Sequence, residues 1–175
     1  MTLEELLESE KNMSVTKENI ENKISWFNNE VVCIKNSFQL WISELGHQII
    51  TQEVEITKTE EPSGTYKTKQ FDFIIDGSVK ISLIPYGIWI IGAKGRIDIH
   101  GPSGTEKLLF FATGGPGVSG EINVGRESEN GIKKINQGYF DNVDEENWYW
   151  YDDSSYRKVA KFSKEIINSL LERLQ

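Results

Sequence analysis

Cysteine and histidine are almost absent from this chain of 175 residues, which contains only Cys33, His47 and His100. A single thiol excludes a disulfide within the chain. So few nitrogen and sulfur ligands argue against a zinc site. The acidic residues at 141–146 lack the spacing and the mid-loop glycine of a calcium loop. We therefore expect neither a disulfide framework nor a metal ion.

Long apolar runs are also missing. No stretch approaches the ~20 apolar residues that a membrane-spanning helix needs. The first residues, MTLEELLESEK, are acidic and lack the basic start and apolar stretch of a secretion signal. Together with the single cysteine, these absences predict a cytoplasmic protein that does not associate with membranes.

Positive charge is scarce, because 27 acidic residues accompany 19 basic ones and the formal net charge is −8. This balance repels phosphate backbones, so we do not expect nucleic acid as a partner. It would attract a basic protein. Solubility alone explains the same charge without any partner.

What the sequence does contain is short apolar runs with a period of two. Four short apolar runs lie between residues 78 and 112, and two of them alternate with polar residues, at Val79, Ile81 and Leu83 and at Ile97 and Ile99. This period is typical of strands with one buried face. The three or four residues between runs allow hairpin-like reversals but no parallel crossover. We therefore predict an antiparallel meander built from all four runs.

Further strands are predicted on either side of this centre. Upstream, residues 48–57 and 66–76 have the same alternation, and Asp76-Gly77 is a strong hairpin signal. Downstream, a weaker hairpin is predicted over residues 122–135, with its turn at Asn130-Gly131. The expected sheet therefore has six or more antiparallel strands.

An apolar stripe with helical spacing precedes the strands. Its members follow one another at intervals of 4, 3, 4, 3, 4, 3 and 4 residues: Ile20, Ile24, Phe27, Val31, Ile34, Phe38, Trp41 and Leu45. Asn12 to Ser14 are predicted to separate this helix from a short one capped by Thr2. The width of the stripe favours packing on the protein's own sheet. The alternative is an oligomer formed through residues 16–45.

A second amphipathic helix is predicted near the C-terminus, after Asp153 or the serines that follow it. The predicted class is therefore α+β, with a long N-terminal helix and a C-terminal helix packed against the meander. We expect one domain over residues 1–175. Its parts are a helical segment at 1–46, the β-meander at 47–136, an acidic and aromatic segment at 137–153, and the C-terminal helix at 154–175.

A glycine-rich segment, Gly115 to Gly120, matches the pattern G-x-G-x-x-G. A dinucleotide site of this type needs a helix that begins within the motif and meets the pyrophosphate with its N-terminus. Residues 121–125 instead have the character of a strand or loop. We therefore expect no dinucleotide cofactor.

Arg96, Asp98 and His100 are the weak candidates for a catalytic or small-ligand site. On a strand, these alternate residues share one face. A guanidinium, a carboxylate and an imidazole in one row could bind an anion or carry acid–base chemistry. A solvated outer face opposite Ile97 and Ile99 explains the same alternation.

The aromatic and acidic segment near residue 150 is the candidate binding surface. It consists of Trp148, Tyr149, Trp150, Tyr151, Asp152 and Asp153. Exposed aromatic rings beside carboxylates would suit a basic protein partner. The alternative is an edge strand whose tryptophans fill the core.

No motif in the sequence identifies a reaction, and the Gly-x-Ser-x-Gly elbow of a serine hydrolase is absent. Our first hypothesis is a non-enzymatic, soluble protein-binding module, such as a small cytosolic inhibitor, adaptor or immunity-type protein with a basic partner. The second is a small-ligand-binding protein or hydrolase-like enzyme that uses Arg96, Asp98 and His100. The third is an assembly protein that oligomerises through the long N-terminal helix.

Overall fold

The computed structural model describes residues 2–123, 132–152 and 158–175, and the structural statements below concern these residues. The first half of the chain forms α1 (Leu3–Glu44), β1 (Ile49–Glu60), β2 (Gly64–Ile75), β3 (Val79–Gly87), β4 (Gly95–Gly101) and β5 (Gly104–Phe111). The second half forms β6 (Gly117–Asn123), β7 (Ile132–Gly138), β8 (Asn147–Tyr151), β9 (Ala160–Lys161), the 3-10 helix η1 (Lys164–Ile166) and α2 (Ile167–Leu174).

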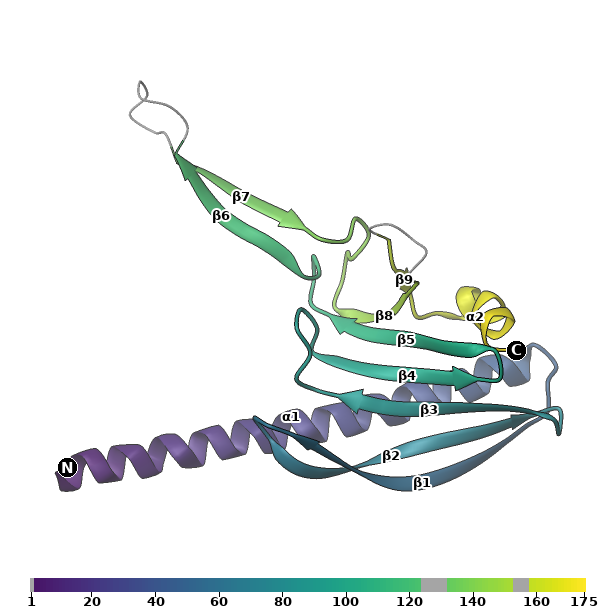
Figure 1. The fold of residues 1–175 in the computed structure, drawn as a ribbon, viewed down its shortest axis with the longest axis horizontal. Helices are drawn as coiled ribbons and strands as arrows, with labels where there is room; N and C mark the ends of the chain where they lie inside the picture. The colour runs from purple at the N-terminus through teal and green to yellow at the C-terminus, as the bar shows by residue number, and fades with distance from the viewer. Residues whose placement is uncertain (1, 124–131, 153–157) are drawn as a thin grey trace.

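Seven of these strands form one antiparallel sheet, in the order β1-β2-β3-β4-β5-β8-β9. Strands β6 and β7 pair only with each other and form a ribbon that projects from the sheet (Figure 1). The predicted α+β class with an antiparallel meander is therefore confirmed. The turn expected at Asn130-Gly131 lies outside the described residues.

Two local predictions for the N-terminal half are confirmed. Thr2 and Glu5 form a capping box, in which the Glu5 N–H donates to Thr2 Oγ1 at 3.2 Å and the Thr2 N–H donates to Glu5 Oε2 at 2.6 Å. Asp76 and Gly77 both have positive φ, 50° and 71°, as a tight hairpin turn of the primed type requires.

The predicted break in the N-terminal helix is wrong, because α1 continues through residues 12–14 as one helix of 42 residues. Asparagine and serine are only moderately unfavourable within a helix, at a cost of about 0.5 kcal/mol each. Neither residue blocks the backbone hydrogen bonds as proline would. This small cost does not end a helix that has good helix formers on both sides.

The C-terminal helix begins later than predicted, at Ile167. Before it, Ala160 and Lys161 pair with β8, and the Phe162 N–H donates to the Trp148 carbonyl at 2.9 Å. The free edge of β8 thus supplies hydrogen bonds that compete with helix formation over these residues.

The main core lies between α1, α2 and one face of the sheet. Helix α1 contributes the buried side chains of Phe27, Val31, Ile34, Phe38 and Ile42. The ring centroid of Phe38, for example, lies 5.1 Å from the ring centroid of Phe73 on β2. The apolar stripe of α1 therefore packs on the protein's own sheet from Ile24 onward.

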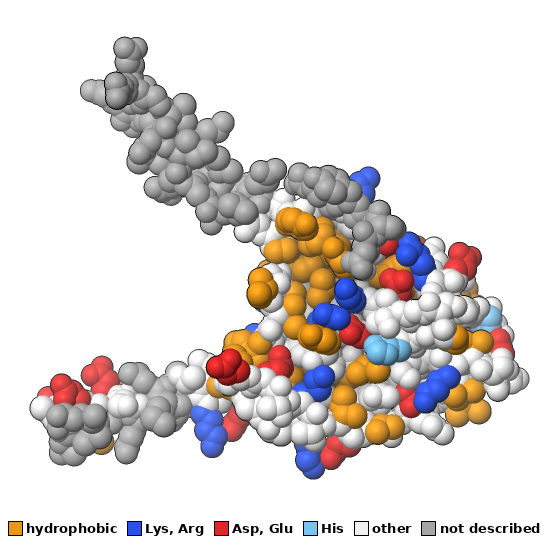
Figure 2. All heavy atoms as spheres, in the orientation of Figure 1, with side chains coloured by type: hydrophobic (Ala, Val, Ile, Leu, Met, Phe, Trp, Pro, Cys, Tyr) orange, Lys and Arg blue, Asp and Glu red, His pale blue; other side chains and the backbone are white. Residues whose placement is uncertain are grey.

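The other face of the sheet is covered only in part. A second apolar cluster covers its β5 and β8 end and contains Phe111, Phe140, Val143, Tyr149 and Val159. Figure 2 shows the molecule from this side, where hydrophobic and charged side chains lie interspersed over the strands. None of the described helices is long and apolar enough to span a membrane.

Candidate functional site

The N-terminal half of α1 extends beyond the sheet. At 1.5 Å per residue its 42 residues span about 63 Å. The core contacts of α1 begin at Ile24 and Trp26, and Lys23 contacts Trp89, so the helix before Lys23 extends past the turn between β1 and β2 (Figure 1).

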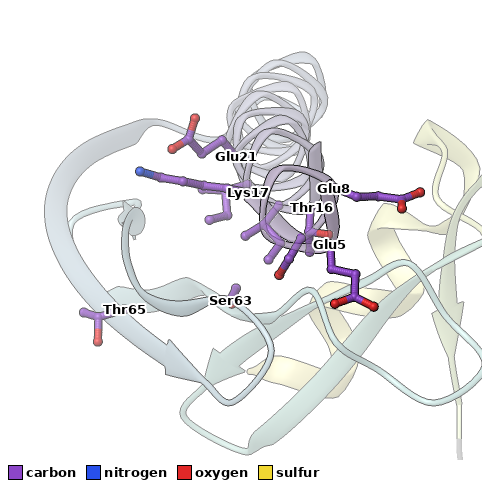
Figure 3. Close-up of a pocket in the computed structure, with 10 residues that line it drawn as sticks. Glu5, Glu8, Thr16, Lys17, Glu21, Ser63 and Thr65 are labelled. Atoms are coloured by element: carbon purple, nitrogen blue, oxygen red, sulfur yellow. The ribbon is translucent and has the colours of Figure 1, made fainter. Parts of the chain in front are cut away.

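A groove of about 820 Å³ lies between this overhang and the β1–β2 turn (Figure 3). Ile20 and Ile24 line it with half-buried apolar side chains. Glu5 and Glu8 project from one flank of the helix, and Lys17 and Glu21 project from the other. Ser63 and Thr65 line the opposite wall, on the β1–β2 turn and the start of β2.

The groove has an acidic rim and an apolar floor. Its lining includes three carboxylates, those of Glu5, Glu8 and Glu21, and one ammonium group, that of Lys17. The hydroxyl of Ser63 is buried and has no hydrogen-bond partner among the described residues. Such a surface is complementary to an apolar segment that carries positive charge.

A half-buried carboxylate, that of Glu60, fixes the wall of the groove to the neighbouring β3–β4 loop. Glu60, at the end of β1, accepts hydrogen bonds from the Tyr66 hydroxyl at 2.5 Å and from the Trp89 N–H at 3.0 Å. The Ile88 N–H also lies within 3.2 Å of both carboxylate oxygens. Through these contacts, the Glu60 side chain joins β1, β2 and the β3–β4 loop.

Helix α1 contacts the same loop through Lys23, whose Nζ lies 4.0 Å from the ring centroid of Trp89. Burial lowers the pKa of this ammonium group below its usual value, although Glu60 opposes the shift. The overhang is thereby connected to the sheet by a cation–π contact next to the groove.

The Tyr66 hydroxyl gives the protein a pH-dependent contribution to stability. Burial, the hydrogen bond to Glu60 and the Glu60 charge raise its pKa well above the ordinary value of 10.0. Because the folded pKa is raised, this stabilisation is fully present below pH 10 and is lost as the pH rises further. The difference in unfolding free energy between wild type and Tyr66→Phe should shrink by about 1.4 kcal/mol per pH unit above 10.

Urea unfolding of both proteins from pH 8 to 11 measures this difference. Tyr86→Phe, which removes the hydroxyl of an exposed tyrosine, is the matched control. Parallel pH profiles for wild type and Tyr66→Phe would contradict the assignment.

The β3–β4 loop corrects one prediction. Of the four apolar runs between residues 78 and 112, three form β3, β4 and β5, whereas Ile88 to Lys94 form a loop with one isolated bridge, between Ile90 and Ala93. The reason is that Glu60 binds the N–H groups of Ile88 and Trp89, which a strand ladder would need. Trp89 is consequently partly exposed, and Ile91 fully exposed.

Arg96, Asp98 and His100 lie on β4, on the face opposite α1, as their spacing predicts. The Arg96 guanidinium donates to both Asp98 carboxylate oxygens, at 2.7 and 3.0 Å, and lies 3.8 Å from the centroid of the Tyr86 ring. No hydrogen bond joins His100 to either residue in the described part of the chain. The arginine charge is thus compensated within the protein.

The aromatic segment contributes mainly to the core. Trp148 and Trp150 are buried on the α1 side, and their indole N–H groups donate to Glu30 and Glu106, each at 2.8 Å. Tyr149 is buried on the other side of the sheet. These three rings offer almost no surface to a partner, which agrees with the interpretation that the tryptophans fill the core.

The remaining residues of that segment lie at the periphery. Tyr151 and Asp152 are partly exposed, and Asp152 accepts a hydrogen bond from Arg173 at 2.6 Å. Asp153 lies outside the described residues. The groove could not be predicted from the sequence, because no single motif specifies how far α1 extends beyond the sheet.

The structure also places the groups considered for cofactors or metals. β6 begins at Gly117, so a strand starts within the glycine-rich segment from Gly115 to Gly120 and continues to Asn123. Within the described ranges, no three side chains of histidine, cysteine, aspartate or glutamate cluster as metal ligands would.

Comparison with known proteins adds no assignment. No protein-family model matches the chain, and neither the curated proteins nor the solved structures gave a significant match.

Proposed function

We propose that this protein is a non-enzymatic binding module that receives a basic, amphipathic segment of a protein partner in the groove beneath α1. The observation that carries the proposal is the combination of an apolar floor, Ile20 and Ile24, with a rim of three glutamates. The apolar side chains would supply burial, and the carboxylates would select positively charged partners.

A helical segment fits this groove best. The groove follows the axis of α1, and its lining residues from Thr16 to Ile24 recur at helical spacing. A second helix alongside α1 could place apolar residues at i, i+3, i+4 and i+7 against Ile20 and Ile24. Lysine or arginine residues flanking its apolar stripe would then lie near Glu5, Glu8 and Glu21.

The strand face of β4 supports a ligand-binding role less well. Two donor groups of Arg96, Nε and Nη2, already bind Asp98, and the guanidinium plane is covered by Tyr86. The negative charge of Asp98 beside these donors would also repel an anion. For this reason we place the binding function in the groove.

The proposal can be tested with a synthetic helical peptide that carries leucine at i, i+3, i+4 and i+7 and lysine between these positions. Isothermal titration calorimetry should detect binding to the wild-type protein. The double variant Glu8→Lys/Glu21→Lys should bind at least about tenfold more weakly, because two attractive charges become repulsive.

The matched control is Glu18→Lys/Glu172→Lys, which makes the same change in net charge at two exposed residues outside the groove lining. This control should retain the wild-type affinity within about twofold. An equal loss of peptide affinity in the two double variants would indicate nonspecific charge attraction and would contradict the proposed site. A peptide with glutamate in place of lysine should not bind.

A further inference from the structure

Strand β1 is a long and regular edge of the main sheet. Its twelve residues pair with β2 without interruption from Ile49↔Ile75 to Glu60↔Gly64. Its other edge pairs with no described strand. The strand contains no proline and no bulge along this length. An unpaired edge of this kind is a template for a further strand, and proteins usually protect it.

The same edge carries exposed apolar side chains. Ile50 and Val54 are 63% and 43% exposed, although they belong to a sheet with a well-formed core. Ile50 pairs with Ile74 on β2, and Ile56 lies two residues beyond Val54, so two apolar pairs, separated by Gln52, lie on the face opposite α1. Nothing within the described part of the chain covers Ile50 and Val54.

We propose that β1 pairs antiparallel with β1 of a second copy of this chain, about a two-fold axis at Gln52. In this register Gln52 lies opposite Gln52 of the second copy, and Ile50 lies opposite its Val54. The pairing joins two seven-stranded sheets into one continuous sheet. It brings the exposed apolar residues of both copies together across the axis.

The charges and the exposed apolar residues of β1 together select this register. An axis at Glu53 or Glu55 would place that glutamate opposite the same glutamate of the second copy. An axis at Val54 would place Glu53 opposite Glu55 of the second copy. Like charges directly opposite each other are destabilising. An axis at Thr51 would shorten the overlap to residues 49–53. An axis at Ile56 or Thr57 would avoid like charges, but it would leave Ile50 outside the overlap and place Val54 opposite Lys58 or Glu60. The Gln52 axis instead pairs Ile50 with Val54, and it places Glu53 opposite Thr51 and Glu55 opposite Ile49.

The glutamates of β1 remain compensated in this arrangement. Lys69 Nζ lies 2.6 Å from Glu53 Oε1, and Lys67 Nζ lies 2.9 Å from Glu55 Oε1. Both lysines belong to β2, on the side of β1 away from the second copy. The self-complementary order of apolar, neutral and compensated residues is the reason that we assign a second copy, rather than another protein, to this edge.

Sedimentation velocity at protein concentrations from about 5 to 200 µM tests the proposal. An interface formed by the edges of two single strands is small, and we expect it to dissociate at roughly micromolar concentration. The wild-type chain should change from monomer to dimer over this range. Ile50→Lys/Val54→Lys should remain monomeric, since the register would then place lysine opposite lysine twice. The control Leu40→Lys/Ile91→Lys also replaces two exposed apolar residues with lysine, but away from β1. This variant should dimerise as wild type does.

A disulfide provides a second measurement that reports the register. In a Cys33→Ser background, Gln52→Cys should form a cross-linked dimer on mild oxidation, because the two thiols would lie directly opposite each other. Thr105→Cys, at an exposed residue of β5 away from the edge, should remain monomeric. A wild-type chain that stays monomeric, a dimer that survives the double lysine substitution, or equal cross-linking at both positions would each overturn the proposal.

Discussion

Replacing Glu60 with alanine is expected to lower the free energy of unfolding by about 3 kcal/mol. The carboxylate accepts hydrogen bonds from the Tyr66 hydroxyl and from the N–H groups of Ile88 and Trp89. Without it, the donors of Tyr66 and Ile88, both in buried residues, would lose their partner. A buried donor without an acceptor costs about 1–3 kcal/mol.

Chemical denaturation of Glu60→Ala and Glu61→Ala would measure this effect. Glu61 is the adjacent residue, it is exposed, and its replacement should change stability by less than about 0.5 kcal/mol. Similar losses in the two variants would show that the Glu60 contacts contribute little. The close approach also explains Gly87, since a Cβ at this position would lie 2.5 Å from Glu60 Oε1.

Replacing Gly101 with alanine is expected to destabilise the protein by about 3 kcal/mol. A Cβ at this position would lie 2.3 Å from the Leu174 carbonyl oxygen and 2.7 Å from the Leu174 Cβ. The end of α2 would have to move away from the sheet. Leu174 is fully buried, and its carbonyl accepts a hydrogen bond from the Ser103 N–H at 3.1 Å, so packing and hydrogen bonding would both suffer.

The control for this substitution lies in the same hairpin. Gly104→Ala would place its Cβ in open space, with no atom within 4 Å, and should leave stability unchanged within about 0.5 kcal/mol. Thermal and urea unfolding of both variants would distinguish steric conflict from a general effect of alanine in this turn. A Gly101→Ala protein as stable as Gly104→Ala would show that α2 adjusts at no cost.

The sequence predicts the architecture well where hydrophobic period and turn chemistry agree. The alternation of Val79, Ile81 and Leu83 predicts β3, and Asp76-Gly77 predicts the hairpin that precedes it. The heptad stripe predicts the helix that covers the sheet. These features depend on residues close in the chain, so they can be recognised without the rest of the structure.

The prediction fails where a distant residue decides the local structure. The apolar run from Ile88 to Ile91 has the composition of a strand, yet Glu60 binds its first N–H groups from 28 residues upstream. The tryptophans at 148 and 150 share a face as predicted, but Trp148 contacts Glu30 and Phe27 of α1, more than 100 residues earlier in the chain. The groove likewise depends on the length of α1 relative to the strands.

The ribbon of β6 and β7 has a consequence for how the chain tolerates change. The backbone leaves the main sheet after Phe111 and returns to it at Asn147, next to the residue from which it departed. At the base of the ribbon the Tyr139 N–H donates to the Pro116 carbonyl at 2.7 Å, so the outgoing and returning segments are already fastened together. The ribbon is therefore a side branch of the fold. We expect a change in the length of this ribbon to leave the register between β5 and β8 intact.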